Sequence, residues 1–134
     1  MRLILDTHIL IWAFFADDLL SDRFKELILE PGNQIYCSTI SLWEAALKYD
    51  RHPDTFPFAP EILQDLCDDA GFGILPLRTS HVLELGGLRT KDNARPHNDP
   101  FDRILLAQAK DEGAVLLTHD RKFAGYSESC FIVD

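Results

Sequence analysis

Short apolar segments alternate along this chain with stretches of helical periodicity, and this alternation constrains the fold more than any other feature. The apolar segments cover residues 2–5, 34–37, 73–75, 114–117 and 130–133. They have the length and composition of buried strands, and none is joined to the next by the short turn of a β-hairpin. Strands that alternate with helices form parallel sheets with helices on both faces. We therefore predict an α/β fold with a central parallel sheet of four or five strands flanked by helices.

Capping and breaking residues mark where the predicted helices begin and end. Ser21 has the character of an N-cap, and Ser41 with Glu44 has the spacing of a capping box, which predicts a helix that begins at Ser41. Asp99, followed by proline, predicts the start of a helix that Gly113 ends. Further helices are expected from Thr7, over residues 60–71 and from Thr79 or Ser80 to residue 86, with loops over residues 51–60 and 88–98.

The length and charge of the chain limit what it can be. Its 134 residues suit one domain, and 46% hydrophobic against 26% charged residues supply enough apolar material for a core. The 13 basic and 22 acidic residues give a net charge of −9, which disfavours unspecific adhesion to the phosphate backbone of nucleic acids. Any contact with a nucleic acid must therefore be local.

Cysteine spacing and hydropathy indicate the compartment. Cys37, Cys67 and Cys130 match neither the close pairs of a zinc site nor an even-numbered disulfide framework, so we expect reduced, buried thiols. The apolar N-terminal stretch is interrupted by Asp6, and no stretch approaches the roughly 20 apolar residues of a membrane span. We expect a cytoplasmic protein without a membrane anchor.

Acidic residues recur at one edge of the predicted sheet. Asp6 directly follows the first strand, and Asp120 follows the strand over residues 114–117. The carboxyl ends of parallel strands share an edge, and the helices that connect such strands begin or end there. Glu44, Asp99 and Asp102, near the starts of two predicted helices, should therefore lie at the same edge.

Carboxylates gathered in this way require a cation. Like charges in a partly buried cleft raise each other's pKa, and a divalent ion removes the conflict. Oxygen ligands favour Mg²⁺ or Mn²⁺, whose coordination shells are often completed by water and a substrate phosphate. Purely structural roles are the alternative for Glu44, as the capping-box partner of Ser41, and for Asp99, as an N-cap. For Asp6 we find little structural reason for an acid.

Four segments together resemble a known family. They cover residues 3–8, 38–44, 97–103 and 116–120. In order and spacing they are similar to PIN-domain ribonucleases, and more narrowly to the VapC-type toxins of bacterial and archaeal toxin–antitoxin modules. The resemblance spans essentially the whole chain, residues 1–134. It implies a single domain with a PIN-like three-layer fold, a metal-dependent endoribonuclease activity, a homodimer and a cognate antitoxin.

The resemblance also implies which acids form the site. The matching positions are Asp6, Glu44, Asp102 and Asp120. Small and apolar residues follow Asp102 along its helix, as in the family pattern, so Asp102 matches the third acid better than Asp99, which stays in reserve. Arg103 departs from the pattern, because many relatives carry a small residue there.

The chemistry expected at this site is hydrolysis of an RNA phosphodiester by water activated on one or two Mg²⁺ ions. The acids divide the work as follows: Asp6 anchors the metal, Glu44 and Asp102 complete its protein shell, and Asp120 binds a second ion or orients water. Thr7 and Thr118 are placed to hydrogen-bond ligand oxygens or a substrate phosphate, with turn and cap roles as the alternative.

The basic residues of one loop are the candidates for contact with RNA. Residues 88–103 hold four basic and three acidic side chains, against the strongly acidic balance of the whole chain. The candidate residues are Arg89, Lys91, Arg95 and Arg103. An ordinary solvated loop is the alternative.

Histidines and aromatic residues are assigned structural roles. The five histidines, His8, His52, His81, His97 and His119, offer no close ligand pair and are expected to be structural or solvated. The aromatic side chains of Trp12, Phe14, Phe15 and Trp43 are expected to lie mainly in the core, with part of this stripe available to a dimer interface.

Three other functions fit less well. A phosphatase of the haloacid dehalogenase type needs a second aspartate two residues after the first, where this chain has His8. A phosphoacceptor receiver domain needs a lysine just after its last strand, where only Asp134 follows. A catalytically silent PIN-like module that binds RNA or protein is compatible with the sequence, although four acids at matching positions favour catalysis.

Overall fold

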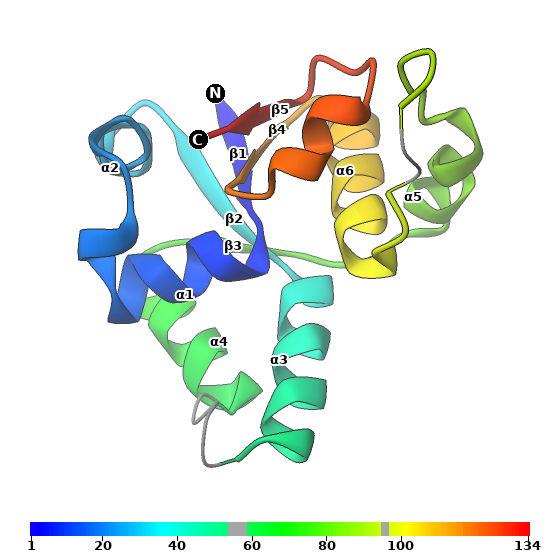
Figure 1. Cartoon of the computed structure of the whole chain (residues 1–134). Coiled ribbons are helices and arrows are strands. Elements are labelled where there is room, and N and C mark those ends of the chain that lie inside the picture. Colours follow the sequence, from blue (N-terminus) through cyan, green and yellow to red (C-terminus); the bar gives the residue numbers. More distant parts are fainter. Residues whose placement is uncertain (54–58, 95–96) are drawn as a thin grey trace.

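Five parallel strands form the centre of the computed structural model, which describes residues 1–53, 59–94 and 97–134 (Figure 1). The strands are β1 (Arg2–Leu5), β2 (Gln34–Ser38), β3 (Gly73–Leu75), β4 (Val115–Thr118) and β5 (Phe131–Val133). Their order in the sheet is β3-β2-β1-β4-β5, and every neighbouring pair is parallel. The predicted α/β fold with a parallel sheet is confirmed.

Helices account for most of the remaining chain. The α-helices are α1 (Thr7–Phe15), α2 (Asp22–Leu29), α3 (Thr39–Arg51), α4 (Pro60–Asp69), α5 (Thr79–Glu84) and α6 (Pro100–Glu112). Short 3₁₀ helices are η1 (Asp17–Leu19), η2 (Leu85–Gly87) and η3 (Arg121–Gly125). Within the described ranges, no helix combines the length and the apolar character needed to cross a bilayer. Part of the loop predicted over residues 51–60 falls on residues 54–58, outside the described part.

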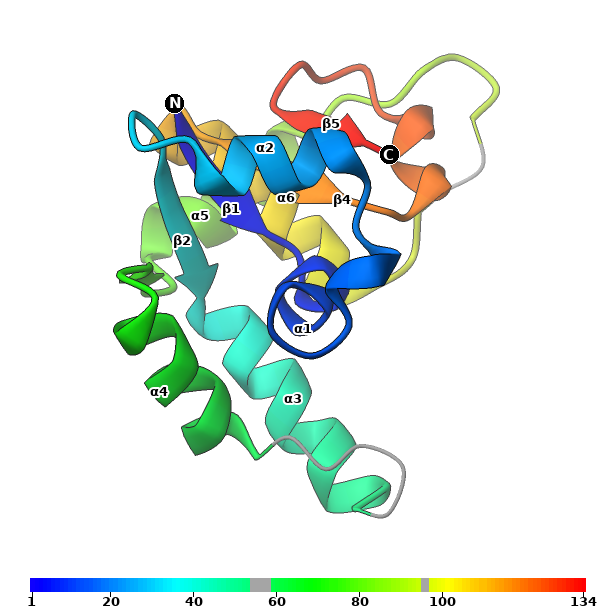
Figure 2. The same ribbon diagram turned by 90° about the vertical axis from the view of Figure 1, so that its left-hand side faces the viewer.

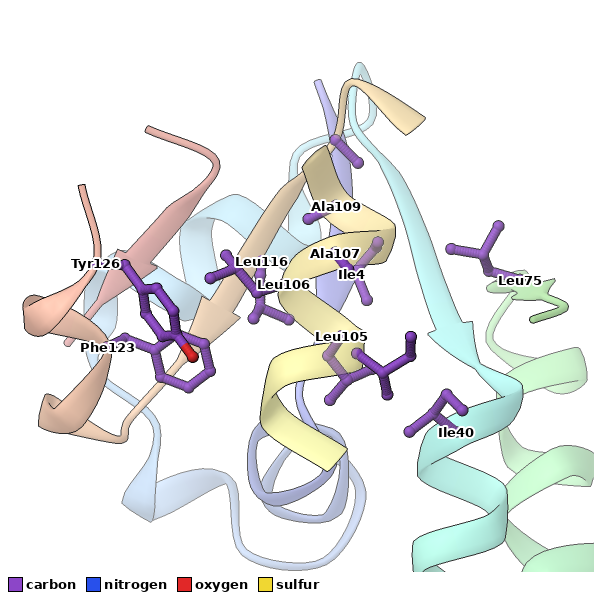
Figure 3. Packing of buried hydrophobic residues seen from close by; sticks show 12 residues of the cluster. Ile4, Ile40, Leu75, Leu105, Leu106, Ala107, Ala109, Leu116, Phe123 and Tyr126 are labelled. Atoms are coloured by element: carbon purple, nitrogen blue, oxygen red, sulfur yellow. The ribbon is translucent and has the colours of Figure 1, made fainter. Parts of the chain in front are cut away.

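The sheet is buried on both faces, because alternate residues of each strand point to opposite sides. Leu3 and Leu5 of β1 pack in a cluster with side chains of α1, α2 and α4. Ile4, between them, joins a second cluster built mainly from α6, with Phe123 and Tyr126 beside it (Figure 3). Each fully buried leucine or isoleucine contributes about 1.5–3 kcal/mol to folding. The three-layer arrangement follows from this alternation.

The predicted helix signals are confirmed at three positions. The Ser21 hydroxyl accepts a hydrogen bond from the Phe24 amide at the start of α2. The Asp99 carboxylate caps α6, and Gly113 ends that helix in the left-handed region at φ 63°. Residues 22–29 and 100–112 are therefore helical for the reasons that the sequence indicates.

The start of α3 differs from the prediction. Ser38, rather than Ser41, is the N-cap, and its hydroxyl accepts a hydrogen bond from the Ile40 amide. Strand β2 runs directly into the helix, so Ser41 already lies in its first turn, fully buried. The serine and Glu44 have capping-box spacing by coincidence, and Glu44 is not a capping partner.

The aromatic residues are less buried than predicted. Trp43 and Phe15 are 55% and 42% exposed, so their assignment to the core is wrong, while Trp12 and Phe14 are half-buried. Trp43 lies on α3, which runs away from the end of the sheet (Figure 2). Among the cysteines, Cys37 and Cys67 are buried thiols, as predicted, and Cys130 is half-buried.

The strand order places a crevice at one point of the sheet. From β1 the chain builds outward through β2 and β3 on one side and through β4 and β5 on the other. In open parallel sheets, ligands bind beyond the carboxyl ends of the strands where the order reverses in this way. Asp6 follows β1, and Asp120 lies just beyond β4. Two of the predicted site acids therefore flank the reversal.

Candidate metal centre

A pocket of about 310 Å³ opens at the carboxyl ends of β1 and β4. Its lining residues are Asp6, Thr7, His8, Trp12, Glu44, Asp99, Asp102, His119 and Asp120. All five acids singled out in the sequence, including the reserve residue Asp99, therefore line one pocket. They come from four segments that are distant in the chain.

Asp6 is the most constrained of these acids. One carboxylate oxygen accepts a hydrogen bond of 2.9 Å from the Ile9 amide and thereby caps α1. The other accepts a hydrogen bond from the Thr118 hydroxyl, which itself accepts one from the Asp120 amide. Burial raises the pKa of Asp6 above its ordinary value. Asp6 therefore has a structural role, as the N-cap of α1, that the sequence did not reveal. The Thr118 hydroxyl hydrogen-bonds an oxygen of this candidate metal ligand, as expected.

Glu44 reaches the pocket from the second turn of α3. Its side chain is largely buried, and one oxygen lies 3.1 Å from the Lys48 ammonium group. Thr7 hydrogen-bonds a serine rather than a candidate ligand oxygen among the described residues. Its hydroxyl donates a 3.0 Å hydrogen bond to that of Ser41, which joins α1 to α3. This bond holds α1, which Asp6 caps, in a fixed position relative to α3, which carries Glu44.

Asp99 and Asp102 enter the pocket at the N-terminus of α6. Asp99 accepts hydrogen bonds from two backbone amides of the first turn, so the N-cap role is confirmed alongside its position in the pocket wall. Asp102 is buried more deeply, and burial together with the charges of Asp99, Asp6 and the other acids raises its pKa to about 8. A bound cation would reverse this shift, because it favours the ionised carboxylate.

His97 belongs to this site, contrary to the structural role predicted for it. Its Nε2 lies 3.1 Å from an Asp102 oxygen and 3.8 Å from an Asp120 oxygen. The ring is almost completely buried and packs edge-on against Phe123, with centroids 4.9 Å apart. Its Nδ1 is buried and has no hydrogen-bond partner in the described part of the chain.

The surroundings of His97 decide its protonation. Burial lowers its pKa, so the ring is neutral near pH 7. The proton then lies on Nε2 when Asp102 is ionised, because that nitrogen faces the carboxylate and Nδ1 meets no acceptor among the described residues. The spacing of the histidines in the sequence gives no indication of this position for His97. The available signal was its position five residues before Asp102, in the segment that leads into α6.

The donor set fits a divalent cation. Donor atoms of His97, Asp102 and Asp120 lie within 4.8 Å of one another, and Asp6 and Glu44 line the same pocket. Carboxylate oxygens are the ligands that Mg²⁺ and Mn²⁺ prefer. The raised pKa values of Asp6 and Asp102 are those of an anionic cluster in which neutralising charge is lacking.

The loop cations Arg89, Lys91 and Arg103, which are predicted to contact RNA and lie within the described residues, do not line this pocket. Arg89 donates hydrogen bonds to Glu128, and Arg103 donates one to the Tyr126 hydroxyl. Lys91 is exposed on the loop. Arg95 lies outside the described residues. Contact of these side chains with RNA stays a prediction, and the observed partners of Arg89 and Arg103 give both a structural role.

Known proteins share this fold. A chain of the crystal structure of VapBC2 from Rickettsia felis bound to a DNA fragment from their promoter is 21% identical, with a TM-score of 0.72 over 99% of this chain and 98% of that chain. Two similar chains come from DNA-bound VapBC of Salmonella typhimurium (18% identity, TM-score 0.64) and from VapBC-1 of nontypeable Haemophilus influenzae (19%, 0.69). Both matches cover 99% of this chain and 98% of the other chain.

Sequence comparison identifies the family. No curated protein sequence matches the chain significantly. The model of the PIN domain family matches residues 3–128, which include every acid of the pocket. The parallel sheet, the acid-lined crevice at its order reversal and this match agree, and the chain belongs to the PIN domain family.

Proposed function

We propose that this chain is a metal-dependent endoribonuclease of the VapC type, the toxin of a type II toxin–antitoxin module. One observation carries the proposal: five carboxylates from four distant segments line a single pocket, where burial and the charges of the other acids raise the pKa of Asp102 to about 8. Such a pocket is suited to a divalent cation and a phosphodiester, and it lies where parallel sheets bind their ligands.

Each acid has a proposed part in binding the metal. Asp6, held by the Ile9 amide and the Thr118 hydroxyl, is the fixed ligand. Glu44 and Asp102 complete the protein shell, and Asp120 binds a second ion or orients the attacking water. A cation bound there, Mg²⁺ or Mn²⁺, lowers the pKa of water and stabilises the negative charge that develops on the phosphate. Asp99, whose carboxylate caps α6, stays in reserve as a ligand because Asp102 matches the third acid of the family pattern better.

Partners follow from the similar structures. The matched chains come from VapBC structures, two of them bound to DNA, which supports a cognate antitoxin as partner of this chain. We also propose a homodimer, for which the exposed side chain of Phe15 provides apolar surface. A cytoplasmic location is proposed on the reduced cysteines.

The activity is tested with purified protein and labelled RNA that contains single-stranded and looped regions. Cleavage is expected only with Mg²⁺ or Mn²⁺, and Asp6→Asn should abolish it. Asp69→Asn, an exposed acid at the end of α4, is the matched control and should cut like the wild type. Cleavage by Asp6→Asn under excess chelator would refute the proposal.

The same assay separates the alternatives. A silent binding module would shift the RNA on a native gel and leave it intact with every divalent metal. A phosphatase would release inorganic phosphate from a small monoester and leave internal RNA bonds uncut.

A further inference from the structure

A second hollow adjoins the acidic pocket. It has a volume of about 520 Å³ and shares His8, Glu44 and Asp99 with the pocket. The residues that it adds are Leu47, Lys48, Arg51, His52 and Phe101. Three residues line both spaces, so the two hollows adjoin, and we call the second one the α3 groove. Its wall changes from acidic to basic along its length.

The basic part lies along one side of α3. Glu44, Lys48 and Arg51 are spaced by four and three residues, which places them on the same side of the helix. At a rise of 1.5 Å per residue, Lys48 and Arg51 lie about 6 and 10 Å beyond Glu44 along the axis. Since α3 runs away from the sheet (Figure 2), this row leads outward from the pocket.

Two basic side chains belong to the groove. Among the described residues that line the pocket and the α3 groove, the lysines and arginines are Lys48 and Arg51. Arg51 is exposed, and Lys48 contacts Glu44 where the acidic and basic parts meet.

An aromatic pair stands beside the same groove. Phe101 lines it, and Trp43 packs edge-on against Phe101 with ring centroids 5.0 Å apart. Trp43 is 55% exposed, although a buried position was predicted for it. An exposed aromatic ring next to aligned cations is the combination that binds single-stranded nucleic acids, through base stacking and phosphate contact.

We propose that the α3 groove binds the RNA strand on one side of the cut bond, with Arg51 and Lys48 on backbone phosphates and Trp43 beneath a base. The inference rests on the proposed function, because it takes the acidic pocket as the place of cleavage. A phosphodiester chain suits both the acidic pocket and the basic groove. Metal ions in the pocket would bind one phosphate, and Lys48 and Arg51 would bind neighbouring phosphates. An acidic peptide would instead bring further carboxylates toward the acids of the pocket.

The test measures binding rather than cleavage. A short fluorescein-labelled single-stranded RNA of mixed sequence is titrated with protein in Ca²⁺ at several salt concentrations, and the RNA is checked for integrity on a denaturing gel. Loss of one phosphate contact lowers the slope of log K against log salt by about 0.7. The slope should fall by this amount in Arg51→Gln. Arg23→Gln makes the same charge change at an exposed position of α2 outside both hollows, and its slope should equal that of the wild type.

A second variant tests the aromatic contact. Trp43→Ala should weaken binding at least ~5-fold with an unchanged salt slope, because stacking does not depend on counterions. Its far-ultraviolet circular dichroism and melting temperature report whether the fold is intact.

The outcomes separate this inference from the proposed function. Equal salt slopes for Arg51→Gln and Arg23→Gln would overturn the α3 groove assignment, whatever the cleavage assay shows. The same holds if the wild type does not bind the RNA, or if Arg51→Gln weakens only the binding of a protein partner. If the wild type binds with the expected Arg51 dependence yet never cuts RNA with Mg²⁺ or Mn²⁺, the groove assignment stands and the nuclease proposal fails.

Discussion

The two ends of helix α6 carry clusters of the same composition and opposite character. Each consists of one buried histidine and two acids: His97, Asp102 and Asp120 at the N-terminal end, and His81, Asp111 and Glu112 at the C-terminal end. In both, the histidine Nε2 meets a carboxylate, at 3.1 Å from Asp102 and 2.7 Å from Glu112. Judged by residue types alone, both would be metal sites.

Their neighbours distinguish them. The Glu112 carboxylate lies 3.6 Å from Arg2 and 3.5 Å from Arg78, so its charge is balanced. The Nδ1 of His81 accepts a hydrogen bond from the Arg78 amide, so the ring proton lies on Nε2. A protonated Nε2 cannot bind a metal. Among the described residues at the other end, no lysine or arginine pairs with Asp102 or Asp120. The acids at the C-terminal end of α6 are therefore neutralised within a structural network, whereas those at the N-terminal end are suited to bind a cation.

The largest effect should come from removing a charge at the N-terminal end. Asp102→Asn is expected to lower the rate of RNA cleavage by more than ~100-fold, because metal ligands stabilise the transition state by several kcal/mol. Asp111→Asn, an acid of the balanced cluster, should cleave at the wild-type rate. Initial rates on labelled RNA with saturating Mg²⁺ measure both. Comparable losses in the two variants would contradict the distinction between the clusters.

The histidines should differ in their influence on the metal. His97→Phe keeps the packing against Phe123 but removes the hydrogen bond to Asp102, and a ~10- to 100-fold weaker binding of Mn²⁺ is expected. His97→Gln restores a donor near the position of Nε2 and should recover most of the affinity. Electron paramagnetic resonance of free Mn²⁺ gives the dissociation constants.

His81→Gln is the matched control for this experiment and should bind Mn²⁺ like the wild type. If His97→Phe binds the ion as tightly as the wild type does, His97 does not position Asp102. If His97→Gln fails to recover affinity while its melting temperature is normal, the donated hydrogen bond is not what matters.

The balanced cluster should matter for stability instead. Glu112→Gln leaves two arginines without their carboxylate, and a loss of about 1–3 kcal/mol in the free energy of unfolding is expected. Urea denaturation followed by circular dichroism measures this loss. Mn²⁺ binding by the same variant should be unchanged, and a weakened affinity there would show that the two ends are coupled through α6.

A further prediction concerns the pH dependence of stability. The pKa of Asp102 is about 8 in the folded chain, above its ordinary value of 3.8, so the folded state binds more protons between these limits. Its contribution to stability is present below about pH 4 and is lost as the pH rises toward 8. In a chelator, the melting temperature of the wild type should therefore fall over this range relative to that of Asp102→Asn. Mg²⁺ should reduce the difference, because it binds the ionised form.

Much of the fold could be predicted because its signals are local. The apolar strands, the Asp99 cap and the Gly113 stop each depend on neighbouring residues, and parallel topology alone brings the strand-end acids to one edge. The start of α3 was misplaced because Ser38 and Ser41 are both plausible caps, and the choice depends on how far β2 extends.

The site was harder to predict where it depends on the path of a loop. The His97 ring, which meets Asp102, packs against Phe123 and Tyr126, and no periodicity encodes these contacts. The exposure of Trp43 likewise depends on tertiary packing rather than on its neighbours in the sequence. The partners of Arg89 and Arg103 are likewise tertiary contacts, invisible in the charge balance of their segment.

The capping of α1 by Asp6 has an evolutionary consequence. A change at this position removes a proposed metal ligand and also the hydrogen bond that caps the helix following the central strand. Neither Glu44 nor Asp102 receives a backbone hydrogen bond on its carboxylate in the described structure. Bacteria that escape a growth-arresting copy of this gene should therefore retain soluble, inert protein when they alter Glu44 or Asp102, and lose the protein itself more often when they alter Asp6.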